Sequence, residues 1–341
     1  MAEDFLRLSA RDRRDALEVA AAHSSRPVHL LEKDVWVVWA LKVMFSAPFG
    51  AQLVFKGGTS LSKAFDAIRR FSEDVDLTYD IRALAGDLTG QGPHPLPPSR
   101  SQEKKWTSIT RQRLTEWVAS RALSTVDAAV RAERVPATAR IKPGDDHAVL
   151  IEYEPLSEGA RYVSPAVLLE FGGRSTGEPC GVRQVRCDAA ELLPGLNFPT
   201  AAPRVMRAER TFWEKATAVH VLCAGGKLRG ERFSRHWYDL VQLDKKGYVE
   251  PALADRALAR SVAEHKRVFF EEKAGGAVID YLEAVNGGLR LVPEGDVLAR
   301  LEDDYRKMSE DGLLLDAAEP LETLLEGCRQ IAARANARGP G

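Results

Sequence analysis

Residues 55–77 read FKGGTSLSKAFDAIRRFSEDVDL and form the most informative stretch of this 341-residue chain. A short apolar strand is expected over 52–55, a tight turn at Gly57-Gly58, and a helix over 60–70. The backbone N–H groups of such a turn, together with the start of a helix, favour a bound anion. Neighbouring side chains add hydroxyl groups or positive charge: Lys56, Thr59, Ser60 and Lys63. An ordinary turn with a helix N-cap is the alternative, and the Walker A pattern is absent.

Directly after this helix, residues 74–79 read DVDLTY, and their alternation of polar and apolar side chains predicts a strand. Side chains at i and i+2 of a strand point to the same face, so Asp74 and Asp76 converge. Two carboxylates placed in this way repel each other unless a cation lies between them, and Mg²⁺ or Mn²⁺ prefers such oxygen ligands. The combination suits metal-assisted phosphoryl or nucleotidyl transfer. The alternative is a pair of solvated acids, although aspartate is depleted in strands.

A third acid, Glu170, lies within the apolar stretch AVLLEFGG, which is typical of a central strand. Burial of a glutamate is costly unless its side chain reaches a ligand or a cleft. Glu170 is therefore a third candidate metal ligand, and three acids on neighbouring strands would form a two-metal site. A strand-end glutamate paired with Arg174 is the alternative.

The C-terminal part contributes further charged candidates. On a helical wheel of 205–223, Lys215 lies at the edge of the apolar stripe, from which it reaches either a triphosphate in a cleft or solvent. In RHWYDLVQL, Arg235 and Asp239 are four residues apart, which also fits a simple helix salt bridge. The glycine-rich segment before them carries Lys227, Arg229 and Arg232 and is typical of a mobile loop for an anionic partner.

The order of the predicted elements indicates the fold class. A Pro/Gly-rich loop is expected over 86–100. The pattern predicts helices over 4–22, 32–45, 101–134, 205–223, 235–245, 252–265, 278–285, 297–308 and 321–335 and strands over 149–153, 166–171 and 182–187. This order predicts an α+β fold with a small mixed sheet followed by a helical C-terminal lobe. The length allows two domains, expected at 1–200 and 201–341.

Composition and charge indicate where the protein is located and what kind of partner it binds. The four cysteines are scattered, no apolar run approaches a transmembrane length, and the N-terminus lacks a signal-peptide pattern, so a cytoplasmic protein is expected. The net charge of −1 conceals two basic stretches, with eight Lys/Arg against four Asp/Glu over 100–134 and eight against three over 204–235. Residues 294–326 reverse this balance, with three against eleven. A basic surface for a polyanion is indicated, and solvated helix faces are the alternative.

The motifs described above, taken together, resemble those of a known protein family. FKGGTSLSKAF…RRFSEDVDL resembles the nucleotidyltransferase motif of the AbiEii/AbiGii toxin family, the toxins of type IV toxin–antitoxin systems, a group that includes MenT-like toxins. The residues on the family signature are Gly57, Gly58, Thr59, Leu61, Lys63, Arg70, Ser72, Asp74 and Asp76. Other motifs of the family correspond to ERTFWEK with Lys215 and to RHWYDL with Arg235 and Asp239. Its N-terminal motif corresponds to LLEKDVW with Lys33 and Asp34. The resemblance extends from about residue 30 to 245.

The resemblance implies a polymerase-β-like nucleotidyltransferase core and a helical lobe that contributes Lys215 and Asp239 to the cleft. The implied activity is transfer of an NMP from an NTP, with Mg²⁺ or Mn²⁺, to RNA. The 3′ end of tRNA is the known type of target, and a cognate antitoxin protein is the implied partner. Asp74 and Asp76 would hold the metal, Lys215 would stabilise charge on the triphosphate, and Asp239 would assist the nucleophilic hydroxyl or orient Lys215. The implied nucleotide-binding residues are Gly57, Gly58, Thr59, Ser60, Lys63, Arg70 and Ser72.

Two other functions remain open from the residues alone. The same acids would serve a metal-dependent phosphoesterase or kinase. A catalytically silent module that binds RNA or protein would also retain this fold.

Overall fold

The computed structural model describes residues 2–24, 26–72, 74–157, 164–226, 232–310 and 314–339. The chain forms two compact units. Unit 1 comprises residues 1–64, 71–93 and 108–206, and unit 2 comprises residues 65–70, 94–107 and 207–341. The chain passes from unit 1 to unit 2 for the last time between residues 206 and 207, close to the domain boundary expected at 200/201. Two short segments of the N-terminal half also belong to unit 2.

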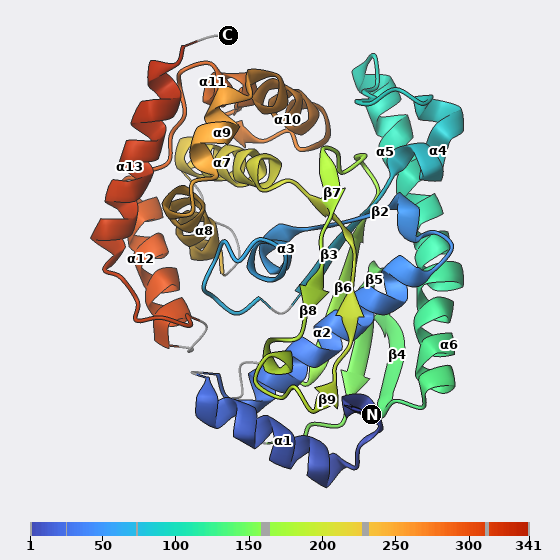
Figure 1. Cartoon of the computed structure of the whole chain (residues 1–341). Coiled ribbons are helices and arrows are strands. Elements are labelled where there is room, and N and C mark those ends of the chain that lie inside the picture. Colours follow the sequence, from blue (N-terminus) through green and yellow to red (C-terminus); the bar gives the residue numbers. More distant parts are fainter. Residues whose placement is uncertain are drawn as a thin grey trace. The chain divides into compact units, whose positions relative to one another are not determined.

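Unit 1 is built on a seven-stranded sheet with the strand order β4–β5–β6–β3–β2–β11–β7 (Figure 1). The strands are β2 (Leu53–Lys56), β3 (Asp74–Tyr79), β4 (Ala137–Lys142), β5 (Asp145–Tyr153), β6 (Ala166–Gly172), β7 (Cys180–Val182) and β11 (Arg204–Met206). β3 pairs with β6 in parallel, and so does β2 with β11, whereas the other neighbours are antiparallel. This mixed sheet, with its surrounding helices, confirms the expected α+β class.

Over its first four residues, the two faces of the central strand β3 differ in burial. Val75 and Leu77 are completely buried, whereas Asp74 and Asp76 point to the opposite face and are half-buried. Alternate burial of this kind is what a period of two in the sequence produces when one face of a sheet is packed. The alternation in DVDLTY therefore fixes both the strand and the face on which its acids lie.

An apolar helix covers one face of the sheet of unit 1 (Figure 1). In Figure 1, α2 (Val28–Ser46) lies across one face, preceded by α1 (Ala10–His23). Trp36 of α2 stacks on Tyr153 of β5 with ring centroids 5.1 Å apart. The long helix expected over 101–134 is present as α5 (Arg100–Trp117), a π-helical turn at Val118–Ala122, and α6 (Leu123–Glu133). Two short helices, α3 (Gly57–Lys63) and α4 (Ile81–Thr89), follow β2 and β3 respectively.

Buried Glu32 of α2 makes the stability of unit 1 depend on pH. Its Oε2 accepts a hydrogen bond from the Leu156 N–H at 3.0 Å, whereas its Oε1 is buried without a partner among the described residues. Burial raises the pKa of Glu32 to about 7, against the opposing effects of the Leu156 N–H, Arg13 and Arg14. The folded state therefore holds more protons than the unfolded state between pH about 4.5 and 7, so stability falls as the pH rises through this range.

We expect Glu32→Gln to remove the fall in stability between pH about 4.5 and 7, because the amide keeps a hydrogen-bond acceptor but carries no charge. The free energy of unfolding at pH 8 should rise by about 2 kcal/mol, with little change at pH 4.5. Urea unfolding of both proteins at the two pH values measures the difference. The same pH dependence in the variant and the wild type would contradict this assignment.

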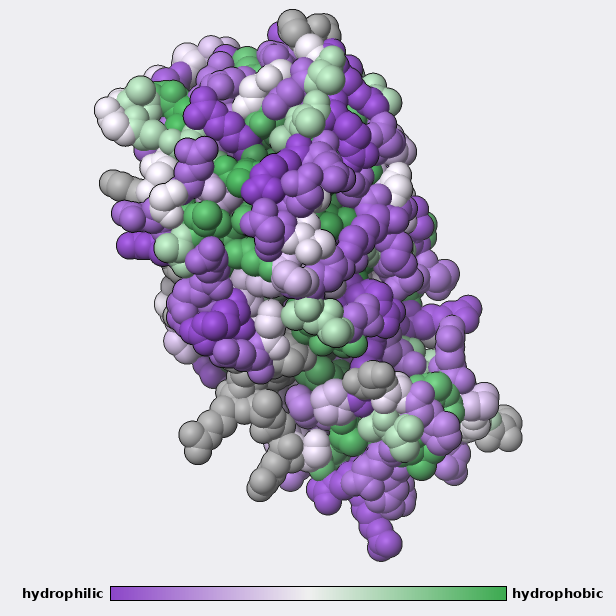
Figure 2. All heavy atoms as spheres, turned by 90° about the vertical axis from the view of Figure 1, so that its left-hand side faces the viewer, coloured by the Kyte–Doolittle hydropathy of each residue, from purple (hydrophilic) through white to green (hydrophobic). Residues whose placement is uncertain are grey.

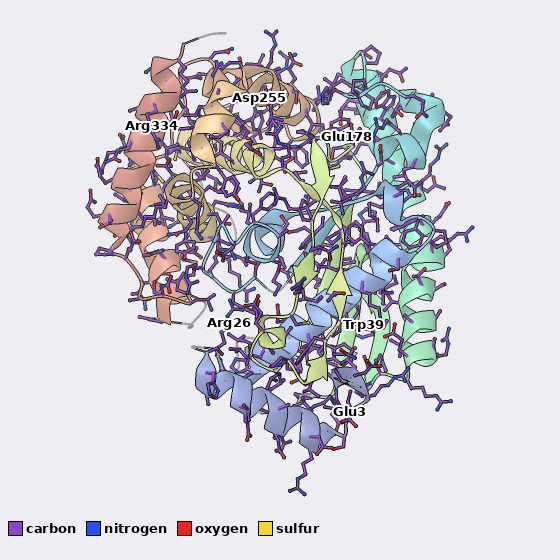
Figure 3. The ribbon with its side chains drawn as sticks, in the orientation of Figure 1. Glu3, Arg26, Trp39, Glu178, Asp255 and Arg334 are labelled. Atoms are coloured by element: carbon purple, nitrogen blue, oxygen red, sulfur yellow. The ribbon has the colours of Figure 1, made fainter. Side chains whose placement is uncertain are left out.

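Unit 2 is mainly helical. Its helices are α7 (Ala208–Gly225), α8 (Ser234–Lys245), α9 (Val249–Ala254), α10 (Arg256–Phe269), α11 (Tyr281–Val285), α12 (Gly295–Glu310) and α13 (Leu321–Ala337). Trp213 and Trp237 are fully buried, and their indole N–H groups donate to backbone carbonyl groups, so neither polar atom is left unsatisfied. Asp255 caps α10 by accepting a hydrogen bond from the Leu258 N–H (Figure 3).

Several expected boundaries were wrong, for identifiable reasons. The helix expected over 60–70 ends at Lys63, because Ala67 and Ile68 are buried within unit 2 in a non-helical segment that begins at Phe65. The loop expected over 86–100 begins later, because α4 continues to Thr89. Asp255 divides the helix expected over 252–265. β4 and β11 were missed, and a two-stranded hairpin, β12 (Lys273–Ala274) with β13 (Ala277–Val278), interrupts the helical C-terminal part.

The surface carries few large apolar side chains. The face shown in Figure 2 is largely hydrophilic, with hydrophobic residues in small groups. Among the described residues, the large exposed apolar side chains come from separate segments: Val19, Val182, Leu192, Phe270 and Val278. Within the same residues, none of the helices combines the length and hydrophobicity required to span a lipid bilayer.

Candidate functional site

Unit 1 aligns charged side chains across three neighbouring strands, with the acids on two of them, β3 and β6. Asp76 of β3 pairs in register with Glu170 of β6 on one side and with Lys56 of β2 on the other. Residues that pair in register point to the same face of a sheet, and Asp74 lies two residues from Asp76 on that face. The two acids predicted from DVDLTY and the acid predicted from AVLLEFGG therefore share one surface.

Burial, and then the charges of the other two acids, Asp76 and Asp74, raise the pKa of the Glu170 carboxyl. Lys142 of β4 opposes this effect, with its Nζ 4.0 Å from Glu170 Oε1. The repulsion means that all three acids are fully ionised together only at a cost, which a cation bound on this face would offset.

The donor set fits a hard divalent cation. No group of three His, Cys, Asp or Glu side chains in the described part of the chain is already arranged to hold a metal ion. Asp74, Asp76 and Glu170 nevertheless offer carboxylate oxygens from one face, and Mg²⁺ and Mn²⁺ bind such ligands together with water and substrate phosphates. Their mutual repulsion is the property that a metal would relieve.

The glycine turn lies directly against this acidic face. Gly57 has φ +78°, and a Cβ atom there would lie 2.0 Å from Asp76 Oδ2, so only glycine leaves room for the carboxylate. The Thr59 hydroxyl lies 2.8 Å from Ser72 Oγ and also bonds the carbonyl oxygen of Asp74. Ser60 donates to the carbonyl oxygen of Gly57 at 2.9 Å. The buried hydroxyl of Thr59 thus ties the turn to the start of β3, whereas that of Ser60 bonds within the turn.

A comparison of two glycines tests this contact. Gly57 and Gly144 both have positive φ, +78° and +81°, but a Cβ at Gly144 would meet nothing within 4 Å. Alanine should therefore cost either position about 1 kcal/mol of stability through backbone strain. Only Gly57→Ala should also displace the Asp76 carboxylate and lower the transfer activity that the sequence resemblance implies, by about 10²-fold. Initial rates and urea unfolding of both variants measure the two effects, and equal activity losses would show that the clash is not responsible.

Lys63 is held by carboxylates of unit 1. Its Nζ lies 2.5 Å from Asp34 Oδ1 and 2.7 Å from Asp188 Oδ1, and its side chain is 9 % exposed. Asp34 also accepts a hydrogen bond from the Asp188 N–H, and Arg26 pairs with Asp188. Lys33, the neighbour of Asp34, donates to the carbonyl oxygen of Ser164 at 3.1 Å. In this structure Lys63 therefore joins α3 to α2, with its charge neutralised by two acids.

Unit 2 contains a second buried charged group, centred on Asp239 of α8. Asp239 is fully buried, and Arg70 holds it through Nε–Oδ1 and Nη2–Oδ2 contacts of 2.7 and 2.8 Å. Lys215 of α7, which is 8 % exposed, reaches Asp239 Oδ2 at 2.9 Å. Burial by itself would raise the pKa of Asp239, but Arg70 and then Lys215 outweigh it and hold the pKa below its ordinary value. Asp239 is therefore an ionised acceptor for two cations.

The structure places further charged residues beside the candidate site residues, and of these Lys56 was already expected from the sequence as a positive charge at the glycine turn. Lys56 pairs in register with Asp76, and Lys142 and Asp145 act electrostatically on Glu170. His236 lies among the charges around Asp239. Lys56 was visible as the residue before the glycine turn, whereas Lys142 and Asp145 come from a hairpin whose first strand the pattern did not reveal.

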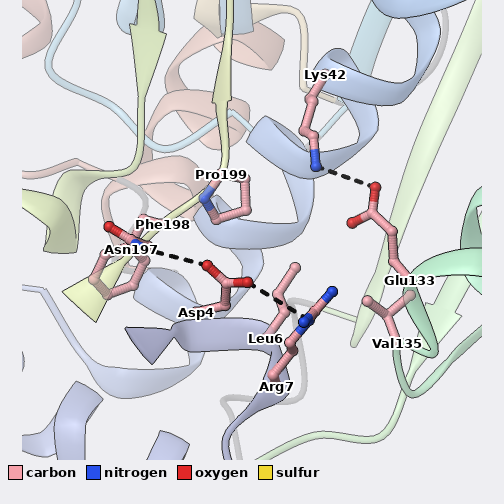
Figure 4. A pocket seen from close by; sticks show the side chains of 9 residues that line it. All are labelled: Asp4, Leu6, Arg7, Lys42, Glu133, Val135, Asn197, Phe198 and Pro199. Atoms are coloured by element: carbon pink, nitrogen blue, oxygen red, sulfur yellow. Dashed lines mark hydrogen bonds and ion pairs between the residues drawn. The ribbon is translucent and has the colours of Figure 1, made fainter. Parts of the chain in front are cut away.

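A cavity of about 310 Å³ lies elsewhere in unit 1 (Figure 4). None of the candidate site residues lines it. Its four charged side chains form opposite pairs, Arg7 with Asp4 at 3.5 Å and Lys42 with Glu133 at 3.1 Å. Because these cations are already neutralised, the cavity offers no strong attraction for the phosphates of a nucleotide.

A carboxylate face packed against a glycine turn suits an enzyme that handles a nucleoside triphosphate with its metal ion, and this chain is a nucleotidyltransferase. It belongs to the AbiEii nucleotidyl transferase toxin family of type IV toxin–antitoxin systems, whose sequence profile matches residues 39–327.

Similar solved structures include MenT4, a nucleotidyltransferase toxin from Mycobacterium tuberculosis H37Rv, which is 18 % identical. That match covers 96 % of this chain and 99 % of MenT4, with a TM-score of 0.48. JHP933 from Helicobacter pylori is 16 % identical over 92 % of this chain and 94 % of its own, with a TM-score of 0.42. Comparison with curated protein sequences gave no match.

Proposed function

We propose that this protein transfers an NMP from an NTP to RNA in a metal-dependent reaction, with the 3′ end of tRNA as acceptor, and acts as the toxin of a cytoplasmic toxin–antitoxin pair. The observation that carries the proposal is the contact between Gly57 and the Asp76 carboxylate on the face shared with Asp74 and Glu170. Family membership supports the class of reaction, and the geometry supports the positions of the acids.

Each candidate site residue of unit 1 has a proposed role. Asp74 and Asp76, with Glu170, would hold Mg²⁺ or Mn²⁺, which neutralises charge developing on the reacting phosphate. The backbone N–H groups of Gly57 and Gly58 would bind the β- and γ-phosphates, while Thr59, Ser60 and Ser72 maintain the turn. Lys63 would act through the position of α3, because its ammonium is already bound by two acids.

In unit 2, the contacts favour one of the two roles considered for Asp239. Its oxygens already accept hydrogen bonds from Arg70 and Lys215, and its pKa is held low, so it is a poor acceptor for the proton of a nucleophile. We therefore assign Asp239 to orienting Lys215 before the triphosphate binds, and Arg70 to positioning Asp239. Lys215 would stabilise charge on the triphosphate, as preorganised cations do.

RNA as acceptor rests on the family and on charge. The basic stretches 100–134 and 204–235 would neutralise phosphates and make binding depend on salt. Arg232 lies within the described residues, whereas Lys227 and Arg229 of the expected basic loop lie outside them. In the proposed reaction, a ribose hydroxyl oxygen bonds to the α-phosphorus, pyrophosphate leaves, and the hydroxyl proton passes to solvent.

The test is incubation of the protein with Mg²⁺, total tRNA and each NTP, labelled at either the α- or the γ-phosphate. Label from the α-phosphate should enter tRNA, and label from the γ-phosphate should appear in pyrophosphate. Release of free phosphate, or label transferred from the γ-position, would instead show a phosphoesterase or a kinase. Binding of RNA without turnover would show a silent module. Asp146→Ala, which changes an exposed acid of β5, is the matched control for Asp76→Ala.

A further inference from the structure

His236 lies inside the charged group of unit 2 but makes no contribution to the contacts described above. It stands three residues before Asp239 on α8, so the two side chains share one face of that helix. Its Nδ1 is buried and has no hydrogen-bond partner among the described residues. A buried acceptor without a partner carries a cost, which indicates that a donor satisfies it in some state of the protein.

The surroundings keep this imidazole neutral. Burial, and then the charge of Lys215, lowers the pKa of His236 to about 3, while Asp239 opposes the shift and Arg70 and Arg235 add to it. Arg70 is committed to Asp239, and the Arg235 Nε donates to the carbonyl oxygen of Arg232 at 3.1 Å. Lys215 is different, because its ammonium has three N–H donors on a flexible side chain and α7 packs against α8.

We propose that His236 is a positioning residue for Lys215, whose ammonium donates to His236 Nδ1 when it leaves Asp239 for the triphosphate. This rests on the role proposed for Lys215. In this structure Lys215 lies 2.9 Å from Asp239 Oδ2, a carboxylate oxygen that neutralises its charge. A neutral imidazole holds the same ammonium in place by a hydrogen bond but leaves its positive charge available to an anion. Removal of the acceptor would leave Lys215 bound to Asp239 or without a fixed direction.

The test is a double-mutant cycle between positions 236 and 215. The probe is inorganic tripolyphosphate with Mg²⁺, with its affinity measured by calorimetry on the full chain, so no transfer reaction is required. His236→Leu should weaken binding about tenfold, because a hydrogen bond to a charged group is lost. His236→Asn should bind within about twofold of the wild type, because its amide oxygen replaces the Nδ1 acceptor. In a Lys215→Ala background, His236→Leu should have almost no further effect.

Nuclear magnetic resonance of the wild-type histidine supplies a second readout that does not depend on the variants folding. Tripolyphosphate should shift the ¹⁵N signal of His236 Nδ1 in the wild type, and this shift should be absent in Lys215→Ala. Equal losses of affinity in both backgrounds, or an unchanged Nδ1 signal, would overturn the proposal for His236 alone. Wild-type affinity in Lys215→Ala would instead reject the proposed role of Lys215, and the inference for His236 with it.

Discussion

Asp74→Ala and Asp76→Ala should each lower NMP transfer by at least about 10³-fold, because each removes a proposed ligand of a metal ion that would stabilise the transition state by several kcal/mol. Neither variant should lose stability. The two carboxylates lie on one face of β3 with Glu170 beside them, so loss of one acid reduces repulsion in the metal-free protein. Initial rates at saturating Mg²⁺ and urea unfolding in EDTA measure the two effects.

Asp146→Ala should retain wild-type rates, because this exposed acid of β5, unlike its neighbour Asp145, is not among the charges that act on Glu170. Glu170→Gln tests the role of the third acid separately from the roles of Asp74 and Asp76. If Glu170 is a ligand, this variant should require a higher Mg²⁺ concentration for half-maximal rate. Wild-type turnover in Asp74→Ala would show that the acids of β3 do not serve the reaction.

The largest stability effect is expected at Arg70. Its replacement by leucine leaves the fully buried Asp239 with Lys215 as its remaining cationic partner, and breaking a buried pair in this way costs about 3 kcal/mol. Arg69→Leu is the matched control. Arg69 pairs with Asp316, but both side chains are about half exposed, so the loss should stay below about 1 kcal/mol.

The pH dependence of Arg70→Leu gives an independent check. The pKa of Asp239 is lowered in the folded protein, so its ionised form stabilises the fold at pH values above about 4, the unfolded pKa, and this contribution is lost as the pH falls further. The difference between Arg70→Leu and the wild type should therefore be constant from pH 6 to 8 and shrink in acid. Guanidinium unfolding at several pH values measures it. Equal effects of the changes at Arg69 and Arg70 would mean that the Asp239 contacts contribute little.

Several elements followed from the sequence alone. β3 has the bounds that DVDLTY predicted, and the long helix over 101–134 is present with only a π-helical turn inside it. Asp74 and Asp76 share a face because the side-chain period of a strand is two, whatever surrounds the strand. These features depend on neighbours a few residues away, which a single sequence displays directly. The resemblance of residues 55–77 to the family motif added the expectation of nucleotidyl transfer at these residues.

Other features depended on packing between distant segments. Nothing near Arg70 in the sequence indicates that it leaves the helix begun at Gly57 and pairs with Asp239, 169 positions away. Lys63 likewise finds Asp188, 125 positions away, rather than the turn beside it. The three-residue strand β11 is too short for a pattern and forms because β2 and β7 flank it.

The sequence by itself therefore determined the class of the fold, the acidic face of β3 and the glycine turn, because short-range sterics and side-chain periodicity are sufficient for each. Only the tertiary structure decided which charges are neutralised. It assigns Lys63 to Asp34 and Asp188, and Lys215 to Asp239, and it leaves His236 Nδ1 without a donor. Burial makes an unpaired charge costly, so the partner of each buried ion is chosen by the groups that folding brings within hydrogen-bond distance rather than by its neighbours in the chain.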